Sequence, residues 1–333
     1  MNLIAWHFAS GNAFCTGVGA VVIGGALLAT TDRRWLKRVA ALLALTGGIF
    51  VCLSATPLPL WSYGLGLLAL PAWLWSERAV RAPRWTRWSL RTAVLAGLLA
   101  LLAAELPHRR LPVLPGAAFR HLIVIGDSLS ARLTGTDTAW PELLARQTGL
   151  DVANLAVPGE TLRTALAAAN RLDSRPAVVV LEIGGNDLLD DTPVWLLNTC
   201  TKLESGDDVP RNDAGPKQFA ADLRDLLVTV HHPARQLIML ELPLPPLANR
   251  YGQIQRRLAR EFGVTLIPKR YFAAIFATPG ATVDGLHLSA AGHEQMARMI
   301  GSVVAPLCNT NGVTSVPRVV HQHDFNLAPA ARL

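Results

Sequence analysis

Charged side chains are scarce in this chain of 333 residues: they make up 17% of it, whereas 51% of the residues are hydrophobic. None occurs between Met1 and Thr31 apart from His7. Such a composition is atypical of a wholly soluble domain and predicts membrane spans joined to a soluble part. No basic segment precedes the first apolar run and more apolar runs follow it, which favours a spanning helix over a cleaved signal peptide.

Further uncharged runs extend this membrane region. The 38 residues from Val39 to Ser76 carry no charge, and Pro57 and Pro59 interrupt them, so we expect two helices joined by a tight turn. A last run, Thr92–Ala104, spans a bilayer only if the charges of its flanking residues reach the interface. The sequence therefore predicts a transmembrane region over 1–106, with four spans near 12–31, 39–56, 59–76 and 90–106.

Basic residues are concentrated in two loops of this region. Four Lys or Arg lie in 32–38 and five in 76–91, so both loops should face the cytoplasm. With four crossings, the N-terminus and everything from about Pro107 onward would then face the periplasm or the cell exterior. Residues 1–106 carry nine basic and three acidic side chains and so hold most of the total net charge of +7, which argues against a nucleic-acid partner.

Glycines are frequent in the first span, in the stretch GVGAVVIGG. Gly17-x-Gly19 lacks the third glycine of a dinucleotide-binding loop and lies inside an apolar run. We interpret these residues as small side chains that allow helices to pack closely.

The rest of the chain alternates apolar runs with helical patterns. A proline-containing linker over 107–119 leads into a domain over 120–307, and residues 308–333 show no period and are expected to form a flexible tail. Continuous apolar strands separated by helices predict a parallel sheet covered on both faces. We expect strands at 121–126, 152–157, 177–184, 236–242 and 264–267, and helices near 140–148, 160–172, 216–230, 249–262 and 289–306. The segment 188–216 is polar and irregular and is expected at the rim of the site.

Cysteine is rare, with four residues in the chain. Cys15 and Cys52 lie in predicted spans, where a small apolar thiol needs no special role. Cys200 and Cys308 are the pair assigned to the outside, where disulfides persist, so they form either a disulfide or two unpaired thiols. No Cys or His spacing suits zinc and His321-x-His323 is a weak metal signal, so we expect neither metal nor cofactor.

Ser128 follows the first predicted strand of this domain directly, in the stretch VIGDSLSA. Small residues at a strand end let the chain turn sharply and present a side chain at the carboxyl edge of a sheet, where ligands bind. Ser128 is therefore a candidate nucleophile. The alternative is an ordinary strand-to-helix turn with Ser128 as the helix N-cap.

A base for such a nucleophile is found in DGLHLS, where Asp284 lies three residues before His287. On a loop, Asp284 can accept a hydrogen bond from one ring nitrogen of His287 while the other nitrogen faces Ser128. The alternative is a surface Asp and His near the start of a helix.

Two further strand ends supply candidate hydrogen-bond donors. Gly159 lies in NLAVPGET and Asn186 in LEIGGNDLL. The backbone N–H groups of Ser128 and Gly159, with the amide of Asn186, would form an oxyanion hole. Each stretch alone is explained by ordinary turn chemistry, but the order Ser, Gly, Asn and Asp-x-x-His along successive strand ends favours catalysis.

With these four stretches the chain resembles the GDSL-type SGNH hydrolases, through GDSL, VPGET, GGND and DGLH over about 120–307. The resemblance implies a flavodoxin-like three-layer α/β/α fold with a central parallel sheet, and hydrolysis of acyl esters or thioesters without a cofactor. An ordinary α/β-hydrolase is disfavoured because GDSLS lacks the closing glycine of G-x-S-x-G.

We therefore expect a membrane-anchored serine hydrolase of the esterase, lipase or thioesterase type, with its catalytic domain outside the inner or plasma membrane. Its substrate would be a lipid acyl ester or an O-acylated envelope glycan, because the bilayer and the envelope are within reach. Two alternatives stay open: an acyltransferase that moves an acyl group through Ser128 onto an envelope glycan, and a non-catalytic binding module. The sequence gives no sign of the oligomeric state.

Overall fold

The computed structural model describes residues 3–79, 82–114, 119–132, 138–191, 215–307 and 319–321. The chain forms two compact units. The helical unit comprises Leu3–Arg110 and Pro243–Gln253, and the α/β unit comprises Leu111–Leu242 and Ile254–Leu333 together with the first two residues. The segment 243–253, which no sequence signal singled out, therefore groups with the N-terminal helices.

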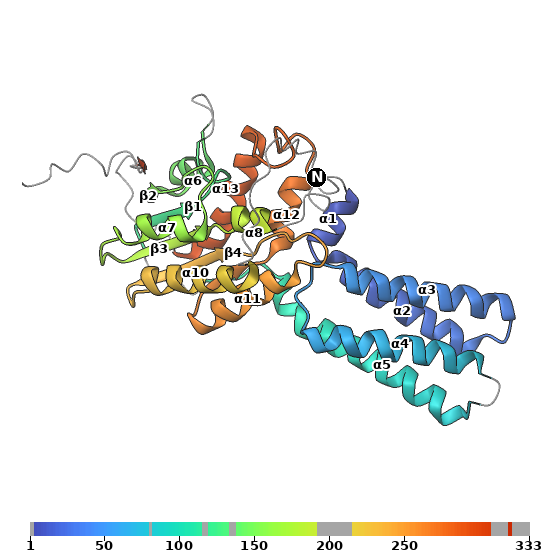
Figure 1. Ribbon diagram of the computed structural model, residues 1–333. Coiled ribbons are helices and arrows are strands. Elements are labelled where there is room, and N and C mark those ends of the chain that lie inside the picture. Colours follow the sequence, from blue (N-terminus) through green and yellow to red (C-terminus); the bar gives the residue numbers. More distant parts are fainter. Residues whose placement is uncertain are drawn as a thin grey trace, which may run out of the picture. The chain divides into compact units, whose positions relative to one another are not determined.

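The helical unit contains five helices, and its long ones run side by side (Figure 1). They are α1 (Leu3–Ala9), α2 (Asn12–Thr30), α3 (Arg34–Leu53), α4 (Leu60–Arg78) and α5 (Arg84–Glu105), which the 3₁₀ turn η1 (Leu106–Arg109) continues. The connections from α2 to α3 and from α4 to α5 lie at the same end of the unit (Figure 1). These are the two connections in which the basic residues are concentrated.

Three of the described helices are long and apolar enough to cross a membrane: α2, α3, and α5 with its continuation to Arg109. The helix α4 is not among them, although its 19 residues match the predicted third span. Its Trp, Ser, Gly and Pro residues lower its mean hydropathy. Four spans thus remain a prediction, with three apolar helices identified.

Glycines bring α2 and α3 into close contact. A Cβ atom added to Gly17 would lie 2.5 Å from the carbonyl oxygen of Gly47, and one added to Gly47 would lie 2.6 Å from that of Gly17. Gly19 has no such neighbour within 4 Å. The packing interpretation of this stretch therefore holds for Gly17, which faces α3, but not for Gly19.

The α/β unit is built on a six-stranded sheet of order β5-β4-β3-β1-β2-β6, in which all neighbouring strands are parallel. The strands are β1 (His121–Gly126), β2 (Asp151–Asn154), β3 (Ala177–Glu182), β4 (Arg235–Leu240), β5 (Thr265–Ile267) and β6 (Val319–His321). The five predicted strands are present with ends shifted by a few residues. The sixth lies in the predicted tail, where three residues are too few to show a period.

Helices cover both faces of this sheet, as predicted from the continuous apolar runs (Figure 1). One face packs against α6 (Trp140–Thr148), α12 (Lys269–Ala277) and α13 (Ala290–Val304) in a single core that includes Val124, Val180 and Ile238. The other face carries α7 (Leu162–Ala169) and α10 (Gly215–Val230), with α11 (Asn249–Glu261) beside α10. All six residues of β3 are buried, which explains why every residue before its last, Glu182, is apolar.

Candidate active site

Ser128 lies in a tight turn directly after β1. The carbonyl of Asp127 accepts from the N–H groups of Ser130 and Ala131, at 3.1 and 2.9 Å. A Cβ atom on Gly126 would lie 2.8 Å from the Cβ of Ser130, so the turn requires glycine there. Ser128 is partly exposed between buried neighbours, and in the described chain no helix begins beside it. The helix-cap alternative therefore does not describe this serine.

Asp284 and His287 form the predicted pair. Nδ1 of His287 lies 2.5 Å from Oδ2 of Asp284, and Oδ1 of Asp284 accepts from the backbone N–H groups of Leu286 and His287 at 2.9 and 2.7 Å. Partial burial opposes ionisation, but these hydrogen bonds and the charge of His287 outweigh it and lower the pKa of Asp284 to about 2. The carboxylate is thus ionised at neutral pH and fixes the imidazole with Nε2 available.

The turn that holds Gly159 is attached to the turn that holds Ser128. After β2, the N–H of Val157 donates to the carbonyl of Gly126 at 3.1 Å, and Gly159 adopts a φ of 76°. No atom lies within 4 Å of the position that a Cβ would take at Gly159. This turn therefore leaves open space next to the backbone where an N–H donor was predicted.

Asn186 lies beside the same turn. It is in the short helix α8 (Gly185–Asp191), and its Nδ2 donates to the carbonyl of Glu160 at 2.7 Å. Its neighbour Asp187 accepts from the N–H of Leu162 at 3.0 Å, at the start of α7. The sequence did not reveal α8, because seven residues are too few to show a helical period. It did not reveal this role of Asp187 either, because its partner Leu162 lies 25 positions away in the sequence.

Three of the four predicted stretches, those of Ser128, Gly159 and Asn186, thus meet at the carboxyl ends of β1, β2 and β3. The fourth stretch is linked to them electrostatically, because burial raises the pKa of Asp127 and the charge of His287 opposes that rise. Ser128 itself makes no hydrogen bond to His287 in the part of the chain described. Catalytic hydrogen bonds are often long in the absence of substrate, so the predicted roles of Ser128 and His287 stay predictions.

The sequence pattern did not single out two buried carboxyl groups near Ser128, those of Asp127 and Glu182. Burial raises the pKa of Asp127 to about 6, and burial together with the charge of Asp127 raises that of Glu182 well above its usual value. The available signal was an acidic residue at the end of the otherwise apolar strand AVVVLE.

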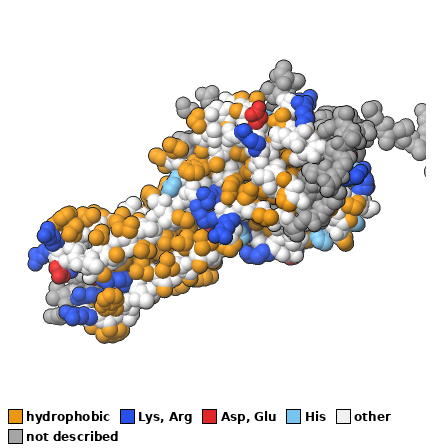
Figure 2. Space-filling model, turned by 180° about the vertical axis from the view of Figure 1, so that it is seen from behind, with side chains coloured by type: hydrophobic (Ala, Val, Ile, Leu, Met, Phe, Trp, Pro, Cys, Tyr) orange, Lys and Arg blue, Asp and Glu red, His pale blue; other side chains and the backbone are white. Residues whose placement is uncertain are grey.

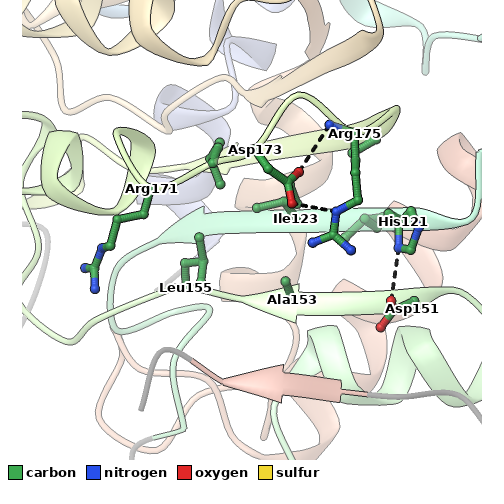
Figure 3. Close-up of a pocket in the computed structure, with 11 residues that line it drawn as sticks. His121, Ile123, Asp151, Ala153, Leu155, Arg171, Asp173 and Arg175 are labelled. Carbon is green, nitrogen blue, oxygen red and sulfur yellow. Dashed lines mark hydrogen bonds and ion pairs between the residues drawn. The ribbon is translucent and has the colours of Figure 1, made fainter. Parts of the chain in front are cut away.

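A separate cavity of about 280 Å³ is lined by residues along β1 and β2 and by the segment between α7 and β3 (Figure 3). Its lining includes His121, Asp151 and Ala177, the first residues of β1, β2 and β3, and none of the predicted site residues. Asp151 pairs with His121 at 3.0 Å, and Asp173 pairs with Arg175 at 2.6 Å. The cavity is thus distinct from the candidate active site.

The predicted disulfide and metal signal fall largely outside the described residues. Cys200, Cys308 and His323 lie there, and only the backbone of His321 is described. Cys15 and Cys52 are free thiols. Within the described ranges, no group of three or more His, Cys, Asp or Glu side chains could hold a metal ion.

Comparison with known proteins finds a family and several relatives that this chain resembles. Residues 124–295 match the family model described as GDSL-like Lipase/Acylhydrolase. The chain is 25% identical over 233 residues to Esterase TesA of Pseudomonas aeruginosa, a match that covers 66% of this chain and all of the relative. A crystal structure of TesA gives 24% identity and a TM-score of 0.44, covering 56% of this chain and 98% of that one. The esterase EstA from Pseudoalteromonas sp. gives 16% identity and a TM-score of 0.43, with coverages of 56% and 97%.

Proposed function

Because the chain belongs to the GDSL-like lipase/acylhydrolase family and is a hydrolase of that class, we propose that Ser128, His287 and Asp284 form its catalytic triad. The backbone N–H groups of Ser128 and Gly159 and the amide of Asn186 would form the oxyanion hole. The observation that carries this assignment is the hydrogen bond between Asp284 and His287, together with the charge of His287 acting on Asp127, the neighbour of Ser128.

In the proposed reaction, Oγ of Ser128 attacks the acyl carbonyl while Nε2 of His287 takes the hydroxyl proton. The C–O bond to Ser128 forms, and the negative charge on the carbonyl oxygen is stabilised by the three donors. Collapse of this intermediate expels the alcohol or thiol, which receives the proton from His287. Water then attacks the acyl-serine in the same way, releasing the acid and restoring Ser128. Asp284 stays ionised and holds the imidazole in one orientation.

The amide of Asn186 is well prepared for this role. An amide nitrogen carries two hydrogens, and one of them is engaged by the carbonyl of Glu160. That bond fixes the direction of the second hydrogen, which is the one proposed to meet the oxyanion. Donors that are oriented before the reaction need no reorganisation in the transition state.

We further propose that the helical unit anchors the enzyme through four membrane spans, with the N-terminus and the α/β unit outside. Support comes from the surface of the helical unit, which is covered with hydrophobic side chains and carries Lys and Arg at one end (Figure 2). Exposed apolar residues occur on each long helix, among them Ile23, Leu42, Leu45, Leu65, Leu67, Leu68 and Leu99. The 19 residues of α4 would extend about 28 Å, close to the thickness of a bilayer core.

With this anchoring, the substrates we propose are acyl esters of membrane lipids, such as lysophospholipids, or O-acyl groups on envelope polysaccharides. Both are available to an enzyme tethered at the outer face of the membrane. A panel of esters with different acyl chain lengths and of acylated glycans, given to the full chain in detergent, would identify the class. Addition of an alcohol or sugar acceptor in the same assay would reveal any acyl transfer.

The triad is tested by comparing Ser128→Ala and His287→Ala with the unchanged chain on a chromogenic short-chain ester. Both variants should lose activity while keeping the fold, and a serine-directed phosphonate should label Ser128. His293→Ala is the matched control, because this buried histidine lies within α13 and should affect stability rather than chemistry. Undiminished turnover by Ser128→Ala would refute the mechanism. An active His287→Ala together with an inactive His293→Ala would reassign the base.

A further inference from the structure

A row of buried polar side chains includes Asp127 and Ser130, which flank Ser128 in the chain. Nε1 of Trp140 donates to Oγ of Ser130 at 3.0 Å, and Oγ of Ser130 donates to Oε2 of Glu182 at 2.7 Å. The carboxyl of Glu182 hydrogen-bonds in turn to that of Asp127. Trp140 and Ser130 are 0% exposed, Glu182 is 1% and Asp127 is 3%, so water does not reach this row.

The hydrogen bond between the two carboxyl groups requires a proton, since two carboxylates can only accept. Oε2 of Glu182 already accepts from Ser130, and Oδ1 of Asp127 accepts from the N–H of Leu129 at 3.0 Å. Burial disfavours two adjacent negative charges and raises the pKa of Glu182 well above its usual value. Burial also raises the pKa of Asp127, to about 6, and Glu182 is the more deeply buried of the two, which favours the proton on Glu182 with Asp127 as the acceptor.

Other charged groups around the pair shift the pKa of Asp127 in both directions. The charge of Asp187, in α8, raises the pKa of Asp127, and that of His287 lowers it. Asp127 in turn raises the pKa of Glu160, which follows the Gly159 turn and is itself partly desolvated. Each of these groups belongs to an element that also carries a predicted site residue. Ionisation of Glu182 would therefore add a second buried negative charge at the site.

The pair also determines the path of the chain through Ser128. The backbone N–H of Asp127 donates to the carbonyl of Glu182 at 3.2 Å, and the Asp127 side chain binds the N–H of Leu129. Ser128 thus lies between Asp127 and Leu129, which the side chain of Asp127 holds together. Both functions of Ser128, its nucleophilic Oγ and its N–H donor, depend on this turn.

We propose that Glu182 is a positioning residue of the esterase: as a neutral acid it donates a hydrogen bond to the Asp127 carboxylate and so fixes the turn that presents Ser128. The proposal rests on the proposed role of Ser128 as nucleophile. It assigns the reaction a residue that touches neither substrate nor triad, located on β3 and 54 positions from Ser128 in the sequence.

The test uses the full chain in detergent and three variants. Glu182→Gln keeps a donor for Asp127 and an acceptor for Ser130, so kcat should stay within about threefold of the unchanged enzyme. Glu182→Ala leaves both partners unpaired and should lower kcat about 10- to 100-fold with KM nearly unchanged. Asp127→Asn places an amide N–H₂ against the proton of Glu182 and should also lower kcat at least about tenfold. The rate of phosphonate labelling at Ser128 should fall in parallel with kcat.

Infrared spectra locate the proton independently of turnover. At pH 7 the unchanged chain should show the C=O stretch of a buried carboxylic acid, and Glu182→Gln should lack it. Equal damage in Glu182→Gln and Glu182→Ala would overturn the proposal, as would full activity of Glu182→Ala. If Asp127→Asn kept its kcat while Glu182→Gln lost it, the proton would belong to Asp127 instead. This comparison is decisive even if Glu182→Ala fails to fold. Inactive Ser128→Ala with unaffected Glu182 variants refutes only the positioning role, whereas active Ser128→Ala refutes the proposed function itself.

Discussion

The side-chain amide of Asn186 donates to the main-chain carbonyl of Glu160 at 2.7 Å. This bond connects the first turn of α8 with the residue that follows Gly159, so the two proposed oxyanion donors outside the Ser128 turn are held to each other. Because the acceptor is a backbone carbonyl, substitutions of the Glu160 side chain leave it in place. Asn186 thus holds the neighbouring turn in addition to its proposed role as an oxyanion donor.

Replacement of Asn186 by Ala should therefore lower kcat about 100- to 1,000-fold with little change in KM, because one preorganised oxyanion donor is lost. Hydrolysis of a chromogenic ester by the full chain in detergent measures both constants. Asn170→Ala is a suitable control, since this exposed residue ends α7 away from the site. A loss of less than about threefold in Asn186→Ala would remove Asn186 from the oxyanion hole.

The Asp284–His287 pair makes stability depend on pH in a defined direction. The pKa of Asp284 is lowered from its usual 3.8 to about 2, so the ionised carboxylate stabilises the fold above pH 3.8. That contribution is lost as the pH falls through about 2. The Asp284 side chain is 45% exposed, so the effect on the free energy of unfolding should be modest.

Unfolding of Asp284→Asn should be compared with that of the unchanged chain between pH 2 and pH 7. The difference in midpoint should be largest above about pH 4 and shrink toward pH 2, because the protonated carboxyl and the amide are then both neutral. A difference that is constant over this range would show that the pair contributes nothing through its charge.

The sequence was sufficient for five of the six strands and for naming candidate site residues, whose roles stay predictions, but not for what surrounds them. Strands buried on both faces, such as β3, leave uninterrupted apolar runs that are visible without a structure. The short helix α8 and the strand β6 have too few residues to show a period. Asp127 and Glu182 lie 55 positions apart, so only the parallel pairing of β1 with β3 brings them together. Their pKa values depend on burial, which a linear pattern does not reveal.

The contact between α2 and α3 gives a prediction about the helical unit. Gly17→Ala should destabilise it, because the new Cβ would lie 2.5 Å from the carbonyl oxygen of Gly47 and the helices would have to separate. Gly19→Ala, two residues further along the same helix, meets no atom within 4 Å and is the matched control. Thermal unfolding in detergent should show a lower midpoint for Gly17→Ala than for Gly19→Ala. Equal midpoints would mean that α2 and α3 are not packed through these glycines.

Membrane topology decides which substrates the enzyme can reach, and it depends on α4 and α5. The two basic connections lie at the same end of the helical unit and should face the cytoplasm, which puts the N-terminus outside. The helix α5 is continuous over 22 residues and is longer than its uncharged stretch alone, which begins after Arg91, the eighth residue of the helix, and ends before Glu105, its last. If both α4 and α5 cross, alkaline phosphatase fused after Pro115 should be active and a fluorescent protein that folds only in the cytoplasm should be dark. Fusions in the connection between α4 and α5 should give the opposite pattern. If α4 did not cross, that connection would report the outside and the fusion after Pro115 the cytoplasm, and envelope glycans would then be beyond the reach of Ser128.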